Sequence, residues 1–204
     1  MPTAIWFDLD GTLLPFPEYD SVISRACETA GVDAVDAFTA EYNDAFFERL
    51  DALDPEPYRR AAATALASID ADTTPDTFVT ALRAAEYDAM PAPDAVRETL
   101  AELSDTAGYR VGVCTNGVGD WQREKLEHAG LADLIDATVV SYEAGAHKPD
   151  PAPFERAESA LSGDRRVMIG DSEDADVAGA RDCGWEAVHV TGPAAVPDAV
   201  ASVR

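Results

Sequence analysis

Short apolar runs alternate with helical patterns through the second half of this chain, and this alternation constrains the fold more than any other feature. We expect strands at Tyr109–Cys114, Ala137–Ser141, Arg166–Gly170 and Ala187–Val190. We expect helices at Asp94–Ser104, Trp121–His128, Pro151–Ala160, Ala175–Cys183 and near Asp198. Elements that alternate in this way form a parallel sheet with helices on both faces. With a further apolar run at Ala4–Phe7 as the first strand, the sequence predicts an α/β fold with a Rossmann-like, doubly wound parallel sheet.

A block without clear strands separates the first strand from this series. Its four expected helices are Tyr19–Ala30, Ala34–Leu53, Pro57–Ile69 and Asp76–Ala89. A chain of 204 residues is long for one compact unit and short for two full domains. We therefore predict a core domain, residues 1–14 and 91–204, with an inserted α-helical cap, residues 15–90. The aromatic side chains of Tyr42, Phe46 and Phe47 are expected in the core of this cap.

Polar residues follow the predicted strands at the point where each strand ends. In chain order they are Asp8 and Asp10, then Thr115, Asn116 and Gly117, then Lys148, and finally Asp171, Ser172, Asp174 and Asp176. Ligands of open parallel sheets bind outside the carboxyl ends of the strands. These residues are therefore expected to build one site.

The residue types at these ends indicate the chemistry of the site. Strand alternation would send Asp8 and Asp10 to the same face, where two like charges ~4 Å apart repel by ~4 kcal/mol at an effective dielectric of 20. Without His or Cys ligands, Mg²⁺ is favoured over zinc as the compensating cation, and Lys148 adds positive charge. The Thr115 hydroxyl and the amides of Asn116 and Gly117 suit an oxyanion. Such an arrangement is typical of phosphoryl transfer, in which one carboxylate attacks phosphorus and the other handles the proton.

Four short motifs in this order resemble those of the haloacid dehalogenase-like superfamily of hydrolases. They are DLDGT at residues 8–12, TNG at 115–117, KPDP at 148–151 and GDSEDADVAGA at 170–180. A helical insertion between the first two motifs is similar to the first cap type of this superfamily. The resemblance implies a phosphatase whose cap supplies much of the substrate specificity.

The resemblance also implies roles for individual residues. Asp8 would be the nucleophile and a metal ligand, and Asp10 the general acid/base, with its backbone carbonyl facing the metal. Thr115 and Asn116 would hold the phosphoryl group, and Lys148 would neutralise it. Asp171 would bind Mg²⁺ directly, and Asp176 would hold a metal-bound water or orient Lys148.

Three other functions remain open. A phosphomutase of the same family would use the same four motifs. A 2-haloacid dehalogenase is disfavoured, because the dehalogenases of this superfamily lack the second aspartate that Asp10 represents. A receiver-like phosphoacceptor switch also combines acidic residues, Mg²⁺, Thr and Lys at a sheet edge, but it has no cap.

The composition indicates the environment and the kinds of partner that suit this protein. The net charge is −24, and the chain contains only two lysines, Lys125 and Lys148. Such a surface is typical of adaptation to high salt and is a poor partner for nucleic acid.

Three cysteines without a CxxC pair argue against a disulfide or metal framework. No apolar run is long enough for a membrane span and no signal peptide is apparent. We therefore expect a cytoplasmic protein with a small phosphorylated metabolite as substrate, while the identity of that substrate and the oligomeric state stay open.

Overall fold

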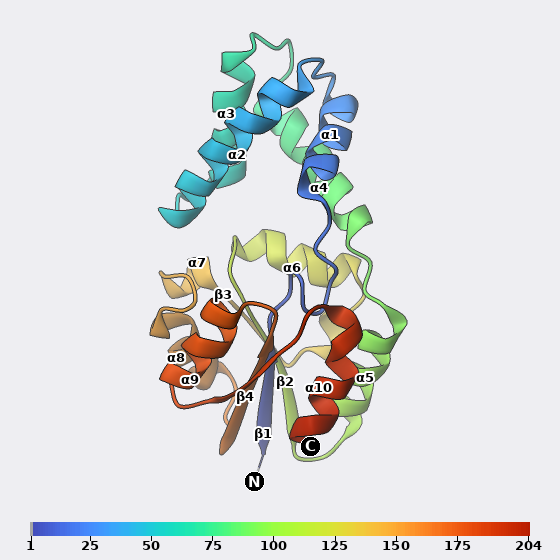
Figure 1. Ribbon diagram of the computed structural model, residues 1–204, viewed down its shortest axis with the longest axis vertical. Helices are drawn as coiled ribbons and strands as arrows, with labels where there is room; N and C mark the ends of the chain where they lie inside the picture. Colours follow the sequence, from blue (N-terminus) through green and yellow to red (C-terminus); the bar gives the residue numbers. More distant parts are fainter. Residues whose placement is uncertain (1) are drawn as a thin grey trace. The chain divides into compact units, whose positions relative to one another are not determined.

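The computed structural model describes residues 2–204, which divide into two compact units (Figure 1). One unit combines the chain up to Pro15 with Pro91–Arg204, and the other is Phe16–Met90. Each unit is described by itself below.

A five-stranded parallel sheet forms the centre of the first unit. Its strands are β1 (Thr3–Phe7), β2 (Tyr109–Thr115), β3 (Ala137–Val140), β4 (Arg165–Gly170) and β5 (Glu186–His189). Their order across the sheet is β3-β2-β1-β4-β5, and all neighbours are parallel. The predicted α/β, doubly wound architecture is thereby confirmed. Four of the five β1 residues are fully buried, as expected for a central strand with helices on both of its faces.

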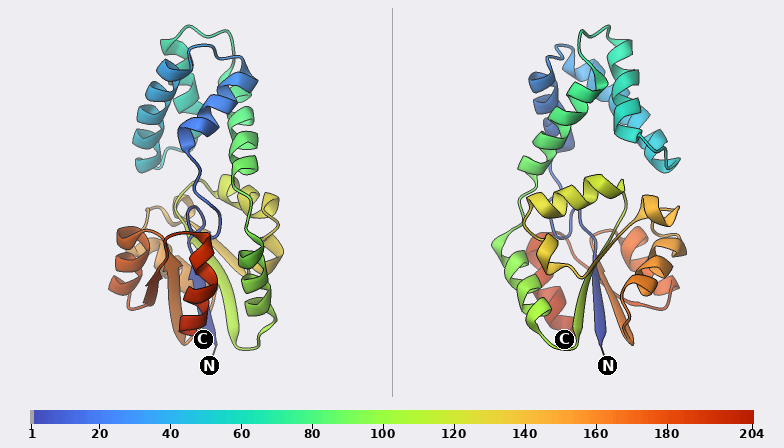
Figure 2. Two further views of the ribbon diagram at one scale, coloured as in Figure 1. Left: turned by 45° about the vertical axis from the view of Figure 1, so that its right-hand side comes forward. Right: turned by 180° about the vertical axis from the view of Figure 1, so that it is seen from behind.

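Helices cover both faces of this sheet (Figures 1 and 2). On one face lie α5 (Asp94–Asp105) and α10 (Val196–Val203), and on the other lie α8 (Pro151–Ala160) and α9 (Gly179–Asp182). Trp6 packs towards the second face with Phe154 and Trp185. Its indole ring needs Gly112 on the adjacent strand, because a Cβ there would lie 2.4 Å from the ring.

Several connecting elements are shorter than the sequence indicates or were not expected. The third strand ends at Val140, and residues Ser141–Ala144 form a short helix, α7. The predicted helix Ala175–Cys183 begins earlier, with a π-helical turn η2 (Glu173–Ala178), before α9. Short 3-10 turns η1 (Ala132–Leu134) and η3 (Pro193–Ala195) were also not expected. Helix α6 (Gly119–His128) lies beside the carboxyl ends of the strands (Figure 2).

The second unit is entirely helical within the described residues. It contains α1 (Tyr19–Ala30), α2 (Val35–Asp51), α3 (Pro57–Ser68) and α4 (Pro75–Ala89). Prolines occupy the first turns of α3 and α4, where their missing N–H is tolerated. α1 packs on α4 and α2 packs on α3.

Aromatic rings form the centre of this helical unit. Tyr42 and Phe46 are buried, as predicted. Their rings contact each other, and Tyr42 also contacts Phe38 and Phe78. Phe47 is 57% exposed, so its predicted core position is wrong. It contacts Phe46 edge-on, because the neighbouring position on α2 turns its side chain outwards.

Across the described residues, no helix combines the length and the apolar character that a membrane crossing requires.

Candidate active site

A hollow of about 260 Å³ opens where the strands of the first unit end. Its lining contains seven of the residues that the sequence predicts for the site, but not Gly117 or Asp174. The seven are Asp8, Asp10, Thr115, Asn116, Lys148, Asp171 and Asp176. Ser172 and Ala175 complete the lining. The sheet thus brings together side chains that are separated by up to 168 residues in sequence, while their individual roles stay predictions.

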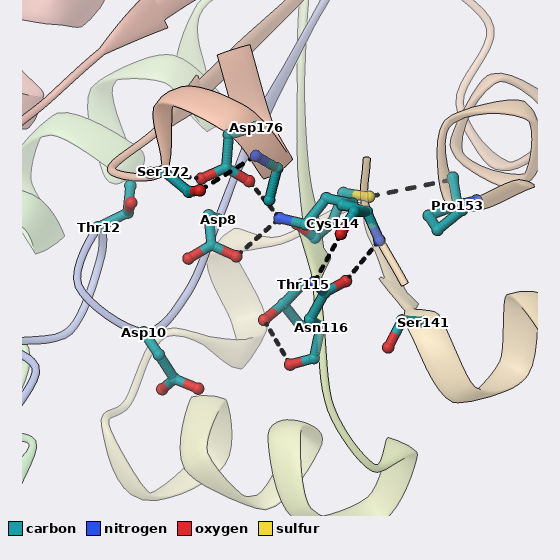
Figure 3. A network of polar contacts seen from close by, with 12 residues as sticks. Asp8, Asp10, Thr12, Cys114, Thr115, Asn116, Ser141, Pro153, Ser172 and Asp176 are labelled. Carbon is teal, nitrogen blue, oxygen red and sulfur yellow. Dashed lines mark hydrogen bonds and ion pairs between the residues drawn. The ribbon is translucent and has the colours of Figure 1, made fainter. Parts of the chain in front are cut away.

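The turn after β1 sets the positions of the first two carboxylates. The backbone of Asp8 is still hydrogen-bonded to the sheet, because its N–H donates to the Ile169 carbonyl. The chain then turns, and the Leu9 carbonyl accepts the N–H of Leu13. Strand alternation therefore does not extend to Asp10, and the expectation of a shared face is wrong. Figure 3 shows the Asp10 carboxylate pointing away from Asp8.

Gly11 allows this turn to approach the end of β4. Its φ of 92° lies in the region that favours glycine. A Cβ at this position would lie 2.5 Å from Asp171 Oδ2. In the next residue, Thr12 Oγ1 donates to Asp171 Oδ1 at 2.9 Å. The first motif thus orients an acidic residue of the fourth.

Lys148 joins three strand ends through its ammonium group. Nζ donates to Asp8 Oδ1 at 2.8 Å and to the Cys114 carbonyl at 2.7 Å. It also donates to Asp176 Oδ1, whose other oxygen accepts the Ser172 N–H at 3.0 Å. Lys148 is only 4% exposed, so this contact set replaces the water that a buried ammonium loses.

Burial and neighbouring charges shift two pKa values in this cluster. Burial raises the pKa of Asp8 to about 7; Lys148 opposes the rise, while Asp176 and Asp10 add to it. For Lys148, burial by itself lowers the pKa, but the charges of Asp8 and Asp176 outweigh this and raise it. The ammonium therefore stays charged at neutral pH.

The second motif mainly orders the loops around the hollow. The Asn116 side chain accepts from the Lys148 N–H at 2.8 Å and donates to the Lys148 carbonyl at 3.1 Å. The Gly117 N–H donates to Ser141 Oγ at 2.9 Å. The expectation that the Gly117 amide would serve an oxyanion is therefore wrong, because α7 supplies its acceptor.

Three carboxylates form a group that fits a metal ion. One oxygen each from Asp8, Asp171 and Asp176 lies within 4.8 Å of the others. All of these donors are hard oxygens, which suit Mg²⁺. Lys148 and Thr12 use Oδ1 of Asp8 and of Asp171, respectively, so Oδ2 of each can act as a ligand. The Asp10 side chain lies outside this group, and the predicted contact of its backbone carbonyl stays a prediction.

Two residues at the site were missed by the sequence analysis. Lys125 Nζ donates to both carboxylate oxygens of Asp10, at 3.0 and 2.9 Å. Gln122 Nε2 donates to Asp10 Oδ2 at 2.9 Å. A signal for Lys125 was present, since it is one of only two lysines in the chain.

Comparison with known proteins gives a family match over most of the chain. A model of haloacid dehalogenase-like hydrolases matches residues 2–184. A ribulose-1,5-bisphosphate 5-phosphatase from Halopiger xanaduensis is 30% identical over 92% of this chain and 84% of its own length. A phosphoglycolate phosphatase from Rhodospirillum rubrum is 34% identical over 90% of this chain and 77% of its own.

Solved structures share the fold of this chain. A 2-haloacid dehalogenase from Pseudomonas syringae pv. Tomato DC3000 superimposes with a TM-score of 0.73 over the whole of both chains, at 22% identity. At this identity, the likeness concerns the fold alone.

Proposed function

Because this chain belongs to the haloacid dehalogenase-like hydrolase family, we propose that it is a Mg²⁺-dependent phosphatase of small phosphate monoesters. The family that the four motifs predicted is confirmed, and the chain is a hydrolase of that family. The observation that carries the proposal is the contact of Lys148 with Asp8, in a hollow that Asp10 and Asp171 also line.

In the first step, Asp8 is the nucleophile. Lys148 holds Oδ1, so Oδ2 attacks phosphorus while the bond between phosphorus and the ester oxygen breaks. Asp10 gives its proton to the leaving oxygen, which departs as an alcohol. The product on the enzyme is an aspartyl-phosphate.

In the second step, Asp10 takes a proton from water, and this water attacks phosphorus. The bond between Asp8 and phosphorus breaks, inorganic phosphate is released, and both carboxylates return to their starting states. Lys148 and the Thr115 hydroxyl provide positive charge and a hydrogen-bond donor for the phosphoryl oxygens.

A bound Mg²⁺ would supply positive charge to the phosphoryl group. The carboxylates of Asp8 and Asp171 would hold it. Asp176 would act mainly on Lys148, because its Oδ1 accepts from Nζ and its Oδ2 accepts from the Ser172 N–H. Its position depends on Gly170, since a Cβ there would lie 2.3 Å from the Asp176 carboxylate.

The names of the relatives support a small phosphorylated metabolite as substrate. Ribulose-1,5-bisphosphate and phosphoglycolate, named for two relatives, are both compact phosphate esters. The predicted cytoplasmic location belongs to the proposal, because such metabolites occur inside cells. The unit Phe16–Met90 is proposed to be the cap that selects among these metabolites.

The net charge of −24 supports adaptation to high salt.

A panel of phosphorylated metabolites tests the proposal. We expect phosphate release that requires Mg²⁺, is abolished by EDTA and is measured at both low and molar KCl. Asp8→Asn should abolish turnover and leave the circular dichroism spectrum unchanged. Retained activity in this variant would remove Asp8 from its role.

Other products would point to the other functions. Formation of an isomeric phosphate without phosphate release would indicate a phosphomutase. Halide release from 2-chloropropionate would indicate a dehalogenase, and a long-lived aspartyl-phosphate without turnover would indicate a switch. Any of these results, without hydrolysis of an ester, would overturn the proposal.

A further inference from the structure

Helix α6 directs two buried side chains at the carboxylate of Asp10. Gln122 and Lys125 lie three residues apart, so both face the same side of the helix. They are 2% and 4% exposed. Lys125 Nζ contacts both oxygens of Asp10, and Gln122 Nε2 contacts Oδ2. Three hydrogen bonds from one helix therefore fix the carboxylate in direction as well as position.

Gln122 also connects Asp10 with the second motif. Its Nε2 lies 3.0 Å from Thr115 Oγ1 and 3.2 Å from the Asn116 carbonyl. The Asn116 carbonyl only accepts hydrogen bonds, so the amide must present its NH₂ group here. Thr115 Oγ1 accepts from Gln122, and its own hydroxyl donates to the Asn116 carbonyl at 3.3 Å. One side chain thus orients both a proton-handling group and a phosphate-binding group.

The use of lysine at this position is informative. The chain has 13 arginines and two lysines, and each lysine is buried against one aspartate of the first motif. A lysine ammonium is a compact charge that can lie between two oxygens, whereas arginine requires room for its planar fork. Burial of such a charge is costly unless it is paired.

From these contacts we propose that Gln122 and Lys125 are positioning residues that hold Asp10 for proton transfer to the leaving group. The inference rests on the proposed phosphatase function and adds a role for α6 to it. Lys148 serves Asp8 in attack, and Lys125 with Gln122 serves Asp10 in protonation.

Leaving-group dependence provides the test. An alkyl phosphate needs a proton on its leaving oxygen, whereas p-nitrophenolate leaves readily without one. In Lys125→Met we expect kcat/KM for an alkyl phosphate to fall by about 10- to 100-fold, part of the range for general acid catalysis. For p-nitrophenyl phosphate the loss should stay below about threefold. A change that merely loosened the fold would lower both values alike.

Three further variants control this result. Lys125→Arg should recover part of the activity towards the alkyl ester, because it restores a cation. Gln122→Met, which leaves no charge unpaired, should show the same selective loss and serves where Lys125→Met fails to fold. Arg123→Met changes a half-buried residue of the same helix that pairs with Glu143, and it should behave as the wild type.

The outcomes separate the two proposals. A wild type that hydrolyses neither ester overturns the proposed function, and the inference with it. A wild type that hydrolyses both esters, with variants that lose both equally, lose neither or gain activity, overturns the inference alone. A wild type that cleaves only the aryl ester also overturns the inference, because protonation of the leaving group would then not be used.

Discussion

Replacement of Lys148 by methionine tests the electrostatic account of the site most directly. The substitution removes the ammonium group that contacts Asp8 and Asp176 but keeps most of the side-chain volume. Asp8 and Asp176 are 8% and 1% exposed, so water cannot replace the lost charge. Removal of one partner of a buried ion pair typically costs about 3–5 kcal/mol. For a chain of this size, that corresponds to a fall in Tm of roughly 6–20 °C.

The loss should depend on pH in a definite direction. In the metal-free protein the pKa of Asp8 is already raised from 3.8 to about 7, and loss of Lys148 raises it further. Between the unfolded and the folded pKa, the unfolded state binds fewer protons, so stability falls as pH rises. In the wild type this window closes at about pH 7, but in Lys148→Met it continues above that value. The difference between the two proteins should therefore widen above neutral pH.

Urea unfolding in EDTA measures this effect at constant ionic strength, because urea carries no charge. Trp6, Trp121 and Trp185 are buried in the first unit, so their fluorescence reports its unfolding. Arg123→Met provides a matched control that removes a partly exposed ion pair, which is worth less than about 1 kcal/mol. If Lys148→Met lost no more stability than this control, or if the gap narrowed above neutral pH, the account of the buried cluster would be refuted.

Three other expectations concern the metal site, the thiols and the acidic surface. Gly11→Ala should weaken Mg²⁺ binding in calorimetry, because a Cβ would lie 2.5 Å from Asp171 Oδ2 and φ is 92°; unchanged affinity would argue against Asp171 as a ligand. In the native protein at pH 8, Cys27 and Cys114 should resist a thiol reagent. Burial raises their pKa values to about 11 and about 12, respectively, so almost no thiolate is present, and denaturant should expose both. Molar KCl should raise Tm, because salt screens the repulsion within a chain of net charge −24. The Debye length at 1 M salt is only about 3 Å. If Tm were the same in dilute buffer as in molar KCl, this expectation would be contradicted.

The sequence allowed the sheet to be predicted because each strand carries its own local signal. β1 and β4 are apolar runs that end in acidic residues, and the side chains at their ends must meet once the strands lie parallel. The hollow therefore follows from topology together with the position of each strand end. The helical unit was predictable for a similar reason, since proline and glycine mark the ends of its helices.

Contacts that arise only after packing were not predictable in the same way. Gln122 and Lys125 lie on a helix whose own pattern gives no indication of its neighbour, and only the folded chain brings them against Asp10. The engagement of the Gly117 amide depends on Ser141, which the sequence predicts as the last residue of a strand but which begins helix α7 in the structure. The direction of Asp10 was missed because the turn at Leu9 interrupts strand alternation.

The burial of both lysines has a practical consequence for the handling of this protein. Lys125 and Lys148 are each 4% exposed, so the folded surface offers no lysine amine to acylating dyes or to amine-directed cross-linkers. Modification of either residue would require the first unit to open. The rate at which these two amines are acylated would then measure the rate at which the first unit opens. Mass spectrometry can follow this acylation without any engineered label.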